Sequence, residues 1–152
     1  MSHLKVSPLT AEDPAYGFHC VLPKQDFSQA LALVTGALKT EGFGVLTEID
    51  VQATMKTKLG VDMPAYRILG ACNPSLAHRA LNAEANIGLL LPCNVLVREE
   101  ADGRLVVAFM DPIAVLQLTS DPEVGRVAQE VREKLDRVRA SLVASHKAPE
   151  TS

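Results

Sequence analysis

Two short cysteine motifs carry the residues of this sequence that are best suited to chemistry. Cys72 lies in the run Gly-Ala-Cys-Asn-Pro and Cys93 in the run Leu-Pro-Cys-Asn-Val, so each thiol stands directly before an asparagine and close to a proline. A thiolate is a soft ligand for zinc or copper(I) and, when its pKa is lowered, a nucleophile. A neutral cysteine also serves as a small buried apolar residue. The pair therefore indicates a metal or ligand site, a redox pair, or simple packing.

The spacing of these cysteines does not distinguish among these three roles. A strong zinc signature needs two C-x-x-C pairs or a cysteine–histidine set, and the sequence contains neither. Cys72 precedes a predicted helix, whose N-terminus would lower the pKa of the thiol and favour a nucleophile. The same position makes Asn73 a good helix N-cap, which is a structural role. Cys20, inside an apolar run, is expected in the core.

Alternating strand and helix signals predict how these motifs are positioned. Helix caps are expected at Asp26, Asp50, Asn73 and Asp121, the last opening a long helix with one apolar stripe. Strands are expected at residues 18–22, 43–49 and 66–71, from Leu89 or Val95 to Glu99, and at 104–110. The element order is then β-α-β-α-β-α-β-β-α. We expect an α+β domain with a mixed, largely antiparallel sheet of about five strands and helices mainly on one face.

The length and direction of the helix between the two cysteines determine how far apart their sulfur atoms lie. If it runs from residue 74 to about 87 and crosses between parallel strands, it is about 21 Å long and carries the chain to the opposite end of the sheet. The sulfurs of Cys72 and Cys93 would then lie on the order of 15–20 Å apart, too far for a disulfide. A tilted helix or a second subunit would change this expectation.

The last two strands predict a different neighbour for the second cysteine. Asp102 and Gly103 form a strong hairpin signal, so the returning strand should bring Asp111 near Cys93 and Asn94. A thiol, an amide and a carboxylate at one rim could hold a polar small molecule or a metal. Cys93, Asn94 and Asp111 are therefore the first ligand candidates, and Cys72 and Asn73 are secondary. Cys93 and Asp111 are the candidate metal ligands, with zinc or copper as the metal.

The composition limits the possible partners. The chain has 152 residues, a net charge of −3, 4% aromatic residues and no basic stripe, which argues against nucleic-acid binding. We expect a loose leader over residues 1–15, one domain over 16–144 and a frayed tail over 145–152. The apolar runs are too short to span a membrane, and no signal peptide is evident. Three cysteines without framework spacing favour a cytoplasmic protein with reduced thiols.

Residues 43–112 resemble the family catalogued as domain of unknown function 302. The matching pieces lie at residues 48–54, 58–61, 66–74, 91–95 and 111–112, and with the flanking helices the likeness extends over about 16–142. The resemblance implies a small bacterial or archaeal α+β domain, similar to the TATA-binding-protein-like fold class and commonly dimeric. It implies no settled activity.

Three functions remain open from the sequence. We expect a homodimeric binding protein with a metal or small-ligand pocket near Cys93. The first alternative is a thiol-dependent redox protein or enzyme that uses Cys72 or Cys93, although no histidine base is evidently paired with either thiol. The second alternative is an assembly protein whose cysteines only pack.

Overall fold

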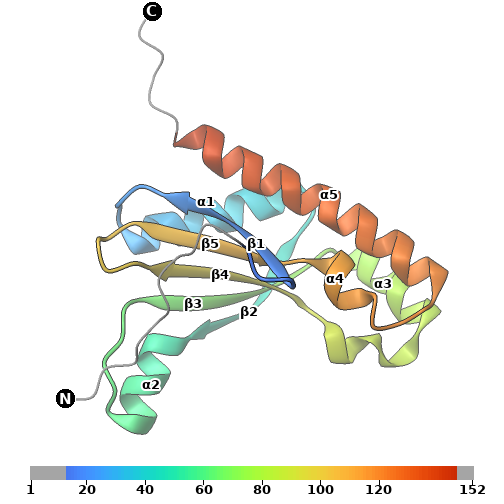
Figure 1. Ribbon diagram of the computed structural model, residues 1–152, viewed down its shortest axis with the longest axis horizontal. Coiled ribbons are helices and arrows are strands. Elements are labelled where there is room, and N and C mark those ends of the chain that lie inside the picture. The colour runs from blue at the N-terminus through green and yellow to red at the C-terminus, as the bar shows by residue number, and fades with distance from the viewer. Residues whose placement is uncertain (1–12, 147–152) are drawn as a thin grey trace, which may run out of the picture.

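Five strands form a single antiparallel sheet in the order β1-β5-β4-β3-β2. A computed structural model describes residues 13–146, so most of the expected leader and tail lies outside the described residues (Figure 1). The strands are β1 (Gly17–Leu22), β2 (Gly44–Asp50), β3 (Tyr66–Cys72), β4 (Cys93–Glu99) and β5 (Leu105–Met110). The helices are α1 (Phe27–Thr40), α2 (Val51–Leu59), α3 (Pro74–Ala83), the 3-10 segment η1 (Ala85–Leu90), α4 (Pro112–Leu116) and α5 (Pro122–Ser145).

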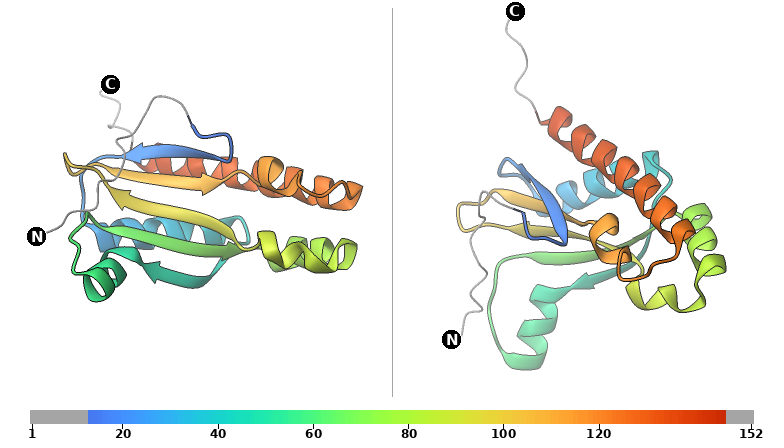
Figure 2. Two further views of the ribbon diagram at one scale, coloured as in Figure 1. Left: turned by 60° about the horizontal axis from the view of Figure 1, so that its bottom comes forward. Right: turned by 45° about the vertical axis from the view of Figure 1, so that its right-hand side comes forward.

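The helices lie mainly on one face of the sheet, as expected. Figure 1 shows α1 and α5 together on one side, while α2 lies on the other side beside β2 and β3. Figure 2 shows that α3 and α5 both extend past the end of the sheet at which β3 ends and β4 begins. This end of the molecule is therefore enclosed by helices rather than by strands.

Local capping signals begin each of the main helices. The carboxylate of Asp26 accepts a hydrogen bond from the backbone N–H of Gln29, and Asp50 caps α2 in the same way through the N–H of Ala53. Asp121 opens α5 by accepting from two backbone N–H groups. These side chains satisfy donors that have no partner within the helix. The predicted capping role of all three residues is confirmed.

The core is formed where α5 packs on the sheet. Its predicted apolar stripe is buried throughout: Val124, Val127, Ala128, Val131, Leu135, Val138 and Leu142. On the sheet, the rings of Phe18 and Phe109 stack with their centroids 5.2 Å apart. Arg132 and Arg139 of α5 cover the Phe18 ring, with their guanidinium carbons 4.0 and 4.8 Å from its centroid. The helix thus closes over the aromatic pair with cations that favour the ring face.

Three expected features differ from the structure. The helix expected over residues 74–87 ends at Ala83, and η1 carries the chain onward, so β4 begins only at Cys93. The sequence places Val51, Met55 and Leu59 on one apolar face of the helix after Asp50, yet no residue of α2 is buried, because α2 lies away from the helical layer that covers the core. Each strand pairing that the structure describes is antiparallel, so the sheet lacks the parallel part of a mixed sheet. None of the described helices combines the length and the apolar character needed to cross a membrane.

Candidate ligand pocket

The register of β3 and β4 brings the two cysteine motifs to the same end of the sheet. Ala71 of β3 pairs with Cys93 of β4, so Cys72 follows immediately after the partner of Cys93. The expectation that these cysteines occupy opposite ends is therefore wrong. Its premise was a crossover along the sheet, whereas α3 and η1 extend beyond the end of the sheet and return to an antiparallel neighbour (Figure 2).

A pocket of about 350 Å³ lies at this end of the molecule. Its walls combine the beginning of β2, the junctions around both cysteines, and parts of α3, η1, α4 and α5. The lining side chains closest to the cysteine motifs are Ala71, Cys72, Asn73, Pro92 and Cys93. The apolar walls come from Phe43, Leu46, Leu76, Ala77, Ala80, Leu81, Leu91, Leu116, Val127 and Val131, and Thr47 and Gly88 complete the lining.

The pocket offers little polarity to a ligand. Of the described residues that line it, none carries a charge, and the polar side chains besides the thiols are Thr47 and Asn73. The amide of Asn73 is engaged in the fold, since its oxygen accepts from the N–H of Leu76 at 3.3 Å. Its amide nitrogen donates to the carbonyl of Glu41 at 3.4 Å. The predicted capping role of Asn73 is thereby confirmed.

Burial favours the neutral form of both pocket thiols. Cys93 is only 6% exposed, and this burial, reinforced by the neighbouring Cys72, raises the pKa of its thiol to about 12. Burial also raises the pKa of Cys72, which is half-buried. A thiol must ionise to act as a nucleophile or metal ligand. At neutral pH these two side chains therefore behave as small, weakly polar walls.

Asn94 and Asp111 lie outside the pocket lining. Asn94 follows Cys93 in a strand and is exposed, because successive side chains point to opposite faces of a sheet. Asp111 caps α4 by accepting from the N–H of Ile113, and it forms an ion pair with Arg132 at 2.8 Å. Within residues 13–146, no group of three or more His, Cys, Asp or Glu side chains has an arrangement that could hold a metal ion. A ligand role for Asn94 or Asp111 stays a prediction.

Comparison with known proteins agrees with this fold. The model of a family described as domain of unknown function DUF302 matches residues 18–142. The chain belongs to the DUF302 family. A crystal structure of an uncharacterized conserved DUF302 protein from Bacillus stearothermophilus superposes with a TM-score of 0.76 at 26% identity, covering 84% of this chain and 98% of that chain. A search of curated proteins finds no match. The family resemblance seen in the sequence is confirmed.

Several residues that line this pocket carry no signal in the sequence. Val127 and Val131 belong to the apolar stripe of α5 and cannot be told from ordinary core residues. Ala77 and Ala80 lie one turn apart on α3, where their small side chains leave space beside the cysteines. Small residues at this spacing are also common in tightly packed helices, so the pattern alone does not predict a cavity.

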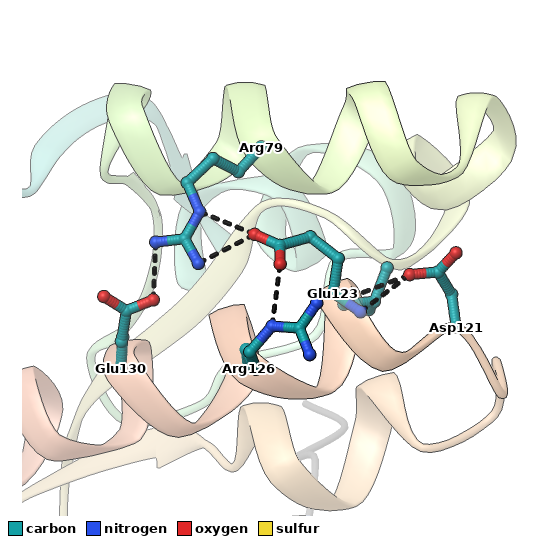
Figure 3. A network of polar contacts seen from close by, with 6 residues as sticks. Arg79, Asp121, Glu123, Arg126 and Glu130 are labelled. Atoms are coloured by element: carbon teal, nitrogen blue, oxygen red, sulfur yellow. Dashed lines mark hydrogen bonds and ion pairs between the residues drawn. The ribbon is translucent and has the colours of Figure 1, made fainter.

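An ion-pair network ties two walls of the pocket together (Figure 3). Arg79 of α3 contacts Glu123 at 2.8 Å and Glu130 at 2.5 Å, both on α5. Arg126 binds Glu123 from the other side at 2.8 Å. The hydrogen bonds from Arg79 and Arg126 hold the pKa of Glu123 below its usual value, so the network stays charged at neutral pH. It joins α3 to α5 through side chains that do not line the pocket.

Thr47 and Pro92, two residues of the pocket lining, pack directly against Gly70, so a larger residue at this position should displace them. A Cβ at this position would lie 2.2 Å from the hydroxyl oxygen of Thr47 and 2.9 Å from the ring of Pro92. We expect Gly70→Ala to lower the free energy of unfolding by about 1–3 kcal/mol, as overpacking does. Urea denaturation measures the change.

A second glycine provides the control. A Cβ at Gly36, inside α1, meets nothing within 4 Å. Gly36→Ala should therefore stabilise the domain by about 0.5–1 kcal/mol through helix propensity alone. Equal effects of the two substitutions would contradict the close packing described at Gly70.

Proposed function

We propose that this DUF302 domain binds a small organic molecule in the pocket beside Cys72 and Cys93. The observation that carries the proposal is the cavity of about 350 Å³, whose walls come from elements far apart in the chain. Ligand pockets in proteins typically measure about 300–1,000 Å³ and are mostly apolar with a few polar groups. Both cysteine motifs contribute to the lining, so the proposal retains the region that the sequence indicated.

The state of the thiols supports ligand binding rather than thiolate chemistry. A metal site needs several ligands, yet within residues 13–146 no group of three His, Cys, Asp or Glu side chains could hold an ion. A nucleophilic role needs a lowered thiol pKa, whereas burial raises the pKa of Cys72 and of Cys93. The thiol-dependent and metal-binding alternatives therefore lack a supporting observation. The homodimer expected from the family resemblance stays a prediction, which sedimentation equilibrium would test.

Filling the pocket should abolish ligand binding. Ala77 lines the cavity from α3 and is partly accessible, so Ala77→Phe would place a ring into the space. A compound from a thermal-shift screen, present at about 100 times its Kd, should stabilise the native protein by about 2.7 kcal/mol. For a chain of this size the gain corresponds to a rise in Tm of roughly 5–10 °C. The shift should disappear in Ala77→Phe.

The control is an equally large substitution on another helix. Ala32 is exposed on α1, and Ala32→Phe should leave the ligand-induced shift in Tm unchanged. Leu81→Trp offers a second obstruction at the rim, since Leu81 is 44% exposed and also lines the pocket. If every stabilising compound acts equally on the native protein and on both pocket variants, the proposed function is wrong.

A further inference from the structure

We infer that the pocket takes an uncharged, largely apolar molecule about the size of two joined aromatic rings. This inference rests on the proposed function, because it assigns the chemical class of the ligand at the same site. Three properties of the pocket carry it, namely the charge of its walls, its volume and the character of its rim.

The walls provide no counter-charge for an ionised ligand. No Asp, Glu, Lys, Arg or His side chain is present among the described lining residues. Arg79 of α3 is not among the lining residues, and it is already bound to two carboxylates of α5, Glu123 and Glu130 (Figure 3). A charged group that leaves water without a partner is strongly disfavoured. The burial of Cys93 and Cys72 points the same way, since it favours the neutral form of both thiols.

The N-terminus of α3 does not make up for the missing charge. Such a terminus attracts anions through its free N–H groups. Here Pro74 has no N–H, and Asn73 already accepts the N–H groups of Leu76, through its side chain, and of Ala77, through its backbone carbonyl. Most donors of this turn are therefore occupied within the fold, and an anion would gain little from them.

The volume and the rim define the apolar ligand further. An engineered apolar cavity of about 150 Å³ is known to bind benzene. The 350 Å³ pocket is about twice as large, so it fits two joined rings or an aliphatic chain of similar bulk. Leu46 and Leu81 line the pocket while remaining 67% and 44% exposed, which gives an apolar ligand an apolar entrance. Thr47 is exposed in the same lining and can accept or donate one hydrogen bond to a neutral polar group.

A matched pair of fluorescent probes tests the inference. N-phenyl-1-naphthylamine is neutral, whereas 8-anilino-1-naphthalenesulfonate has the same ring skeleton with one added negative charge. We expect the neutral probe to bind saturably with one site per chain and at least tenfold more tightly than the sulfonate. Ala77→Phe should remove this saturable fluorescence, and Ala32→Phe should retain it.

The outcomes separate this inference from the proposed function. If the sulfonate binds as tightly as the neutral probe, and Ala77→Phe removes its signal, the pocket binds ligands but the inferred class is wrong. Saturable binding of the neutral probe that survives both Ala77→Phe and Leu81→Trp places the probe elsewhere and overturns the inference. Absence of saturable binding by the neutral probe also overturns it, while the thermal-shift screen decides the proposed function independently.

Discussion

Phe109→Ala should lower the free energy of unfolding by about 3–5 kcal/mol, the range typical of a buried aromatic truncated to alanine. Phe109 lies on β5, is 2% exposed and stacks on Phe18 with a centroid distance of 5.2 Å. Its loss removes apolar burial, leaves a cavity and separates the aromatic pair. Equilibrium denaturation in urea measures the change.

An exposed aromatic residue is the control for this truncation. Tyr16 precedes β1 and is 67% exposed, so Tyr16→Ala should change stability by less than about 0.5 kcal/mol. A cost below about 1 kcal/mol for Phe109→Ala would show that the aromatic pair is not part of the folded core.

Stability should fall steeply as the pH rises above about 9, because two buried thiols resist ionisation in the folded state. Burial raises the pKa of Cys20 from 9.0 to about 11, partly offset by Arg139, and that of Cys93 from 9.0 to about 12. Above pH 9 the unfolded chain releases these protons while the folded chain retains them. The unfolded state then binds fewer protons, so the free energy of unfolding decreases with rising pH.

Each thiol should contribute a loss of about 2 kcal/mol between pH 7.5 and 10.5, at about 1.4 kcal/mol per pH unit above its unfolded pKa. The contribution of Cys20 levels off near pH 11 and that of Cys93 near pH 12. Urea denaturation of the native protein and of Cys93→Ala at both pH values isolates one thiol. Lysines and tyrosines titrate alike in both proteins. The difference between the two losses in the free energy of unfolding therefore reports the thiol of Cys93 alone.

Cys93→Ala should therefore lose about 2 kcal/mol less than the native protein over this range. Cys72→Ala should remove a smaller part of the pH dependence, because Cys72 is only half-buried. Identical pH dependence in the native protein and in Cys93→Ala would mean that the thiol of Cys93 is open to solvent. In that case the assignment of Cys93 to a neutral apolar wall would be wrong.

The helices of this domain could be predicted where their signals are local. Asp121 followed by Pro122 predicted the start of α5, and the spacing of its apolar residues predicted its buried face. The glycine at position 60 adopts a positive φ of 66° at the end of α2, as its C-cap position requires. Such signals act within one helical turn, so no knowledge of distant segments is needed to read them.

The arrangement of the cysteines was predicted incorrectly, although both motifs were recognised. The error concerned the segment that joins β3 to β4, since a strand–helix–strand pattern fits both a crossover between parallel strands and a return to an antiparallel neighbour. The pairing of Ala71 with Cys93 shows that the return is antiparallel, and this pairing depends on the whole sheet rather than on the local sequence. The hairpin does bring Asp111 to the end of the sheet where Cys93 lies, because Val95 of β4 pairs with Phe109 of β5, as the turn signal predicted. Its carboxylate caps α4 and pairs with Arg132 there.

The sequence by itself determined the element order, the helix caps, the stripe of α5 and the family to which the chain belongs. Only the tertiary structure decided that α3 and α5 leave a cavity between them and that both cysteine motifs line it. Caps and periodicity arise from neighbours along the chain, and a residue pattern records them directly. A cavity is the space left when helices and strands from distant segments pack, and its volume depends on side chains that otherwise look like ordinary core.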